Sequence, residues 1–223
     1  METVELGAQS MDDNVLRLSG RGHTSAITAE ASAMVKSAGM TLILQMMTGL
    51  PGSDAQSDLR TGERLAELKP NGVRIYPTVI LRGTVLERMW REGKYAAHTV
   101  HDAVNTCAPI ADVFLRAGIP ILRLGLNQTE ALAGGEAVGG ACHPALGELV
   151  YSKLWLDKAR AAIRSLQRIP RRLTLLVSEN MVSRMTGHRG ANLLILRWEY
   201  GLDEVRVRGC AFPQETVAID AES

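Results

Sequence analysis

The chain has 223 residues and a formal net charge of +1, with 46% hydrophobic and 22% charged residues. This composition is ordinary for a soluble globular protein, and no run approaches the roughly 18 apolar residues that would span a bilayer. The N-terminus lacks the basic and apolar regions of a signal peptide, so we expect a cytoplasmic protein that does not contact a membrane.

Three apolar segments in the first third of the chain have the length of buried parallel strands. They recur roughly every 30 to 35 residues, at 4–8, 40–47 and 72–76. Between them we predict a helix capped near Asp12, a helix that begins after Thr24 and ends before Gly39, and a helix over about 54–68. Ile27, Ala31, Met34, Val35 and Ala38 lie on one side of the second helix. This βαβ rhythm predicts a parallel sheet or a (β/α) barrel.

Three such units form only part of a barrel. The first strand would leave an unpaired edge, and the inward-facing side chains would be exposed. We therefore expect that an N-terminal half-barrel is missing.

Beyond the third strand the pattern becomes mostly helical. We predict helices at about 84–93, 99–117 and 144–166 and strands at 119–125, 171–177 and 205–208. A glycine-rich loop is expected over 134–140, one or two helices precede the last strand, and the chain is expected to fray from Pro213.

The three cysteines, Cys107, Cys142 and Cys210, are far apart in the sequence. They form no CxxC or CxxxC pair and have no histidine at a metal-binding spacing, so local spacing predicts no zinc or iron–sulfur site. We interpret them as reduced thiols in or near the core.

Positive charge is concentrated near the C-terminus. Residues 151–210 contain 12 Lys and Arg against 5 Asp and Glu. Such a segment can attract a polyanion such as RNA, and a merely solvated surface is the alternative. Only nine aromatic residues are available for base stacking. The arginines concerned are Arg168, Arg171, Arg172, Arg184, Arg189 and Arg197.

In a (β/α) barrel, ligand-binding groups lie where the strands end. Here the three predicted strands are followed by Gln9-Ser10, by the glycine turn 48–52 and by the polar segment 76–84. All three would lie at the same end of the sheet, although turns after strands require glycine in any case.

In this order and spacing, the segments resemble radical S-adenosylmethionine (SAM) proteins of the Elongator catalytic-subunit type. Residues 118–165 resemble the extension that follows the barrel in the same proteins. The segments that carry the resemblance are VELGAQS (4–10), RGHT (21–24), MMTGLPG (46–52), RIYPT (74–78), RGT (82–84), WREGKY (90–95), RLGL (123–126) and HPALGEL (143–149).

The resemblance implies an α/β fold in which a partial (β/α) barrel is followed by a mixed α/β extension. The barrel part would contain the last three strands of a six-stranded radical SAM barrel. The implied domains are the C-terminal half of the barrel (1–97), the radical SAM C-terminal extension (98–170) and a small basic α/β appendage (171–223). Too few residues remain after 170 to form the acetyltransferase domain of the Elongator subunit.

The resemblance also implies contacts with SAM. Gln9 matches a glutamine that contacts SAM, and Arg21 matches an arginine near the SAM carboxylate, for which a guanidinium is well suited. Gln45 lies where related coproporphyrinogen oxidases often have an acidic residue near the ribose. Tyr76 and Thr78 lie near the expected adenosyl group.

Simpler roles stay open for some of these residues. Gln9 could be a structural amide at a strand end, and Arg21 could cap a helix or pair with Asp12 or Asp13. His23 and His143 lie in the matching segments, but neither has a partner at a metal-binding spacing.

Radical SAM enzymes hold a 4Fe–4S cluster with a CxxxCxxC motif and use it to cleave SAM to a 5′-deoxyadenosyl radical. This sequence contains no CxxxCxxC. We therefore expect a SAM-binding chain with no catalytic residue of its own, and a cluster present only in a full-length protein. The chain alone is expected to be inactive. The substrate is unknown, and two alternatives are a tRNA-modifying enzyme and a non-catalytic module that binds RNA or a partner.

Overall fold

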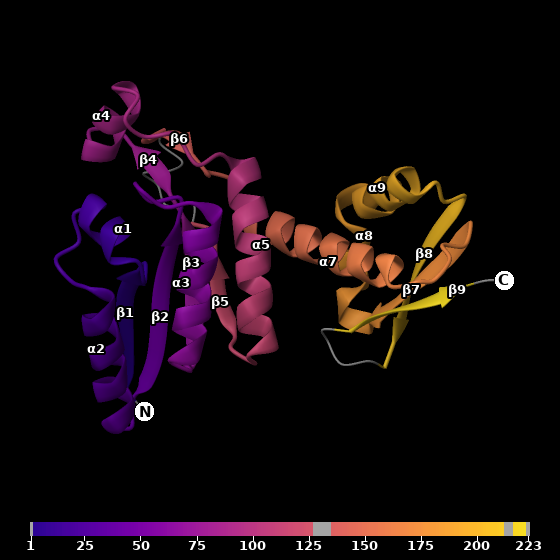
Figure 1. Ribbon diagram of the computed structural model, residues 1–223, viewed down its shortest axis with the longest axis horizontal. Helices are drawn as coiled ribbons and strands as arrows, with labels where there is room; N and C mark the ends of the chain where they lie inside the picture. Colours follow the sequence, from indigo (N-terminus) through magenta and orange to yellow (C-terminus); the bar gives the residue numbers. More distant parts are fainter. Residues whose placement is uncertain (1, 127–134, 212–215, 222–223) are drawn as a thin grey trace. The chain divides into compact units, whose positions relative to one another are not determined.

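The computed structural model describes residues 2–126, 135–211 and 216–221 (Figure 1). The chain divides into two compact units, Met1–Gly147 and Glu148–Ser223, which are described separately here. The three domains expected from the resemblance, with boundaries at 97 and 170, stay a prediction.

A parallel four-stranded sheet forms the centre of the first unit. Its strand order is β1-β2-β3-β5, so the expected parallel arrangement is confirmed and the sheet does not close into a barrel. The register pairs Leu6 with Leu44 and Leu44 with Val73. The strands are β1 (Thr3–Gln9), β2 (Thr41–Thr48), β3 (Gly72–Pro77) and β5 (Ile121–Leu124).

Side chains alternate between two faces of this sheet. Leu42, Leu44 and Met46 of β2 are fully buried on one face, and Val73 and Ile75 of β3 join them there. Because βαβ crossovers are right-handed and β1, β2 and β3 follow one another across the sheet, their connecting helices cover this same face. The opposite face, which we call the open face, has Ile43 and Gly72 buried beneath Leu122 at one end. Its other residues are exposed or half-buried: Glu5, Gly7, Gln45, Met47, Arg74 and Tyr76.

The helices of the first unit begin where the sequence predicts. Asp12 accepts hydrogen bonds from the first turn of α1, and Thr24 caps α2, which is followed by Gly39 in a left-handed conformation. In the described ranges, no helix is long and apolar enough to cross a membrane. The helices are α1 (Asp13–Leu18), α2 (Ser25–Ser37), α3 (Ala55–Glu67), α4 (Val85–Arg91) and α5 (Val100–Arg116).

The apolar side of α2 does not form part of the core. Thr28 and Ser32 are buried, whereas Ile27 is 50% exposed and Met34 is 71% exposed. Small side chains let the helix lie close to β1 and β2, and Ser32 Oγ satisfies its hydrogen bond by donating to Thr28 O over 2.7 Å.

A second, two-stranded sheet stands at the carboxyl end of the parallel strands. It pairs β4 (Val79–Leu81) with β6 (Ala137–Gly140) in antiparallel fashion. The prediction of a glycine-rich loop was therefore wrong for residues 137–140. Gly140 has a φ of +93°, and a Cβ there would lie 2.7 Å from Thr78 O, so only glycine allows this close pairing. Gly134, the first residue of the predicted loop, lies outside the described residues.

The second unit has helices on a three-stranded sheet of order β8-β7-β9. Strand β7 is parallel to β8 and antiparallel to β9. Since Val217–Ala221 forms β9, the expectation that the chain frays from Pro213 was wrong for this segment. The elements are α7 (Leu146–Arg164), β7 (Arg172–Ser178), the short helices Glu179–Met181 and His188–Gly190, α8 (Val182–Thr186), α9 (Ala191–Tyr200), β8 (Glu204–Cys210) and β9 (Val217–Ala221).

The burial of Leu44 on β2 and the exposure of Met34 on α2 predict different effects of substitution on stability. Leu44→Ala should lower the free energy of unfolding by about 2–5 kcal/mol, because it leaves a cavity in the packed face. Met34→Ala should change it by less than about 0.5 kcal/mol, because the side chain is mostly in water. Urea unfolding followed by far-UV circular dichroism measures both, and equal losses would contradict the orientation of α2.

Candidate functional site

Two of the predicted site residues meet on the open face. Gln9 ends β1, and its Oε1 accepts a long hydrogen bond of 3.5 Å from Nε2 of Gln45 on β2. The register explains this contact, because Gln45 lies beside Gly7 and the amide of Gln9 reaches back over that glycine. A Cβ on Gly7 would lie 2.6 Å from Gln9 Nε2. Glycine therefore leaves room for the amide on this face.

The backbone of Gln9 is held in an unusual conformation. Its φ is +61°, in the left-handed region, and the pairing between β1 and β2 shifts by one residue between Gly7 and Gln9. A non-glycine residue in this region costs of order 1 kcal/mol and is often found at functional sites. Although Gln9 is only 4% exposed, its side chain reaches the open face through this shift.

Tyr76 ends the same face on β3. A hydrogen bond to Tyr76 raises the pKa of Arg74, and the negative charge of Glu5 raises it further. Arg74 Nε lies 3.1 Å from Glu5 Oε1, across the width of β2. Gln9 and Gln45 are thus in contact, and Tyr76 lies on the same face, two residues beyond Arg74, the register partner of Gln45. Their role in SAM binding stays a prediction.

Arg21 lies in the loop between α1 and α2. His23, two residues later, places a ring nitrogen 3.3 Å from Ala8 O, so this loop lies at the carboxyl end of β1. The Arg21 side chain is exposed and has no partner in the described part of the chain. Asp12 accepts hydrogen bonds from the amides of α1, and Asp13 accepts one from Ser25 N.

Thr78 has a structural contact instead of a free hydroxyl. It is 2% exposed, and its Oγ1 donates to Thr48 O over 2.7 Å while its amide donates to the same oxygen over 2.9 Å. These two bonds join the ends of β2 and β3. The hydroxyl donor is therefore already used.

Sequence reasoning missed the group that shapes the turn after β2. The buried carboxylate of Asp58 on α3 accepts a hydrogen bond from Gly49 N over 2.8 Å, so this amide of the glycine turn 48–52 is not available to a ligand. Tyr95 donates to Gly49 O over 2.6 Å. Gly49 has a φ of +71°, and a Cβ there would lie 2.3 Å from the His98 ring.

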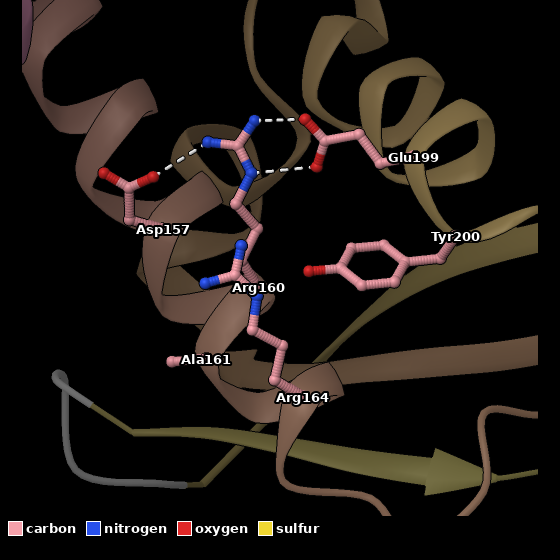
Figure 2. Close-up of a pocket in the computed structure, with 6 residues that line it drawn as sticks. All are labelled: Asp157, Arg160, Ala161, Arg164, Glu199 and Tyr200. Atoms are coloured by element: carbon pink, nitrogen blue, oxygen red, sulfur yellow. Dashed lines mark hydrogen bonds and ion pairs between the residues drawn. The ribbon is translucent and has the colours of Figure 1, made fainter.

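The second unit contains a polar cavity of about 550 Å³ between α7 and α9. Figure 2 shows Arg160 held by Asp157 on one side and by both oxygens of Glu199 on the other, with the Tyr200 hydroxyl pointing toward α7. The hydrogen bond from Arg160 lowers the pKa of Glu199. Two arginines (Arg160 and Arg164) face two carboxylates, so the lining has no net charge to attract an ionic ligand.

Comparisons with known proteins extend this picture. Residues 70–155 match the family described as the Radical_SAM C-terminal domain. Over 98 residues, 43% of this chain, the sequence is 38% identical to a tRNA uridine(34) acetyltransferase of Dehalococcoides mccartyi. Over 110 residues it is 32% identical to Elongator complex protein 3 of Homo sapiens. The fold matches the archaeal Elp3 of Methanocaldococcus infernus with a TM-score of 0.60 and 26% identity, over 71% of this chain and 36% of that one.

The resemblance to radical SAM proteins of the Elongator type is confirmed. The matched segments cover only 21% of the bacterial relative and 20% of the human one, so the chain spans about a fifth of their length. The helices and the parallel sheet correspond to the radical SAM type of fold that the sequence predicted.

The three cysteines do not fit the cluster that this family implies. Cys107 is fully buried, and burial raises the pKa of its thiol to about 12; Cys142 is exposed and Cys210 is partly buried in the second unit. Within the described ranges, no group of three His, Cys, Asp or Glu side chains could hold a metal ion. These residues therefore offer no set of thiolates for an iron–sulfur cluster.

The buried carboxyl of Asp58 should make the stability of the fold depend on pH. Burial raises the pKa of its carboxyl from 3.8 to about 6 in the folded chain. Because the unfolded chain releases this proton first, stability should fall by up to about 3 kcal/mol as the pH rises between the two values, and should not change further above them.

Asp58→Asn should remove this slope and be more stable than the parent chain at neutral pH. Asp54→Asn is the control, because Asp54 is exposed and hydrogen bonds from Ser57 lower the pKa of its carboxyl. Urea unfolding at several pH values measures both variants. If the stability of Asp58→Asn depended on pH as strongly as that of the parent chain, the assignment of this dependence to Asp58 would be refuted.

Proposed function

We propose that the open face of the first unit binds SAM as part of a radical SAM enzyme that modifies tRNA. The observation that carries this proposal is the meeting of Gln9 and Gln45 over Gly7, on the face of the sheet that also carries Tyr76. The two amides and the phenol offer hydrogen bonds suited to an adenosyl group, and Gly7 leaves room for the Gln9 amide on this face. The names of the tRNA-modifying relatives support tRNA as the substrate class.

Each of these side chains has a distinct part in the proposed site. Gln9 and Gln45 would bind polar atoms of SAM, and Tyr76 would bound the adenosyl group. Arg21, exposed at the end of β1 and without a partner among the described residues, would bind the carboxylate. Thr78 would act indirectly, because its hydroxyl holds the end of β2 against the end of β3.

When bound to a reduced 4Fe–4S cluster, SAM supplies a 5′-deoxyadenosyl radical. The cysteines of this chain do not form a ligand set, so the proposal assigns the cluster to cysteines outside this sequence. The part of this chain is to bind and orient SAM. Cytoplasmic localisation belongs to the same proposal.

The test is binding of S-adenosylhomocysteine to the chain, measured by equilibrium dialysis. Gln9→Ala should weaken binding about tenfold, which corresponds to one or two lost hydrogen bonds. Gln56→Ala is the matched control, because Gln56 is an exposed residue of α3. No binding by the parent chain, or equal binding by the two variants, would refute the site. Reconstitution with iron and sulfide should give no SAM cleavage, and cleavage by the chain alone would refute the assignment of the cluster.

A second candidate function, RNA binding by the second unit, is favoured by Trp198. This residue of α9 is 86% exposed, and Leu194, one turn earlier, is 61% exposed. Arg197 and Arg189 are exposed nearby in the sequence, and neither has an ion pair in the described part of the unit. Single-stranded bases stack on exposed aromatic rings, and arginines on the same unit add positive charge that attracts the phosphates.

Trp198→Ala should weaken binding of an oligouridylate by a factor of about 5 to 100, the range expected for a lost base stack. Leu194→Ala should have little effect, because leucine offers no ring. Fluorescence anisotropy at several salt concentrations measures affinity, which should fall as salt rises. Binding that is insensitive to salt, or a larger loss in Leu194→Ala, would instead indicate an apolar protein-docking surface.

A further inference from the structure

The open face carries two arginines side by side that the proposed SAM contacts do not use. Arg74 on β3 is the register partner of Arg123 on β5, so the two residues lie on the same face. Neighbouring strands are about 4.8 Å apart, which places two guanidinium-bearing residues within reach of one small anion. β5 is the last strand of the sheet, so this pair lies near its edge.

A shift in the strand pairing creates this arrangement. Val73 pairs with Ile121, but Arg74 pairs with Arg123, so Leu122 is an extra residue in β5. A Cβ on Gly72 would lie 2.9 Å from Leu122 Cδ1, so Leu122 also lies over the open face. In such a bulge both residues of the pair turn to one side, which brings Arg123 to the face that carries Arg74.

The two guanidinium groups differ in their partners. Arg74 is held by Glu5 at 3.1 Å and by a hydrogen bond to Tyr76. Arg123 is half-buried and has no ion pair in the described part of the chain, and its Nε, like that of Arg74, is enclosed without a hydrogen-bond partner there. Enclosing a charged donor without an acceptor is energetically unfavourable, so binding an anion would stabilise the Arg123 guanidinium. The face has two positive charges here and one negative charge.

We infer that Arg123, with Arg74 beside it, binds a phosphate-type oxyanion of the substrate, namely an RNA phosphodiester. The planar fork of a guanidinium matches the oxygens of a phosphate, and a neighbouring guanidinium held by Glu5 adds charge without moving. The identity of the anion rests on the proposed tRNA substrate. The carboxylate of SAM is the other possible source, and the experiment separates the two.

The probe is the dinucleotide uridylyl-uridine, with uridine as its uncharged counterpart. Binding is followed through the arginine Nε–Hε signals of the ¹⁵N-labelled chain. The Arg123 signal, assigned through R123Q, should shift saturably with the dinucleotide and not with uridine. R123Q should weaken dinucleotide binding at least tenfold, and R123K should restore part of it. R116Q is the matched control, because Arg116 is exposed on α5 and pairs with Asp112.

If Arg123 had only a structural role, its substitution would change the melting temperature and leave the dinucleotide affinity unchanged. R123Q removes an enclosed donor without a partner, so its melting temperature should equal or exceed that of the parent chain, whereas a structural residue would lower it. A lower melting temperature with unchanged dinucleotide affinity would overturn the inference, as would the absence of a saturable shift in the parent chain.

The cofactor and the substrate are separated by S-adenosylhomocysteine. If R123Q weakens binding of this compound and leaves dinucleotide binding intact, the anion belongs to the cofactor and the inference fails. If the parent chain binds the dinucleotide but not S-adenosylhomocysteine, the proposed SAM site fails and the phosphate site stands.

Discussion

The parallel pairing of β1, β2 and β3 determines where each polar side chain of the site lies. Side chains alternate strictly along a strand, so a slip of one residue would move Gln45 to the packed face and Leu44 to the open face. Burial of Leu44 contributes about 1.5–3 kcal/mol, and the hydrogen bond between Gln9 and Gln45 at 3.5 Å contributes less than a well-formed bond of about 1 kcal/mol. The hydrophobic face of the sheet therefore positions the site, and the site's own contacts contribute little to the register.

The carboxyl end of β2 is organised by polar groups that come from distant parts of the sequence. Asp58 on α3 and Tyr95 after α4 bind the amide and the carbonyl of the same glycine, Gly49. Thr78 ties the next strand to Thr48. These contacts leave the turn after β2 with little freedom to adapt to a ligand. In the proposed site, recognition would therefore fall to the side chains of the open face.

Apolar runs, helix periodicity and capping residues in the sequence predicted the three strands, the caps at Asp12 and Thr24 and the parallel arrangement of the sheet. They failed for α2, because helix periodicity locates an apolar stripe without showing that the sheet packs against it. They also failed for residues 137–140, where two glycines concealed a strand that forms only by pairing with Val79–Leu81.

For the candidate site, the sequence predicted Gln9, Gln45 and Tyr76 through the strand ends and the resemblance. The contact between the two glutamine amides depends on the shift in pairing at Gly7, which local propensity does not encode. Asp58 and Arg123 were missed for the same kind of reason. A buried carboxylate on a polar helix and an arginine in a short strand gain their meaning only from the residues that the fold brings beside them.

The left-handed backbone of Gln9 has a consequence for how this chain could change over generations. Glycine is the residue that adopts such a conformation without steric cost, so selection for a robust fold alone would favour glycine at this position. Under the proposed function, the glutamine at this position is a compromise in favour of its amide. In descendants that lost the proposed SAM binding, this strand end should be among the early positions to drift toward glycine.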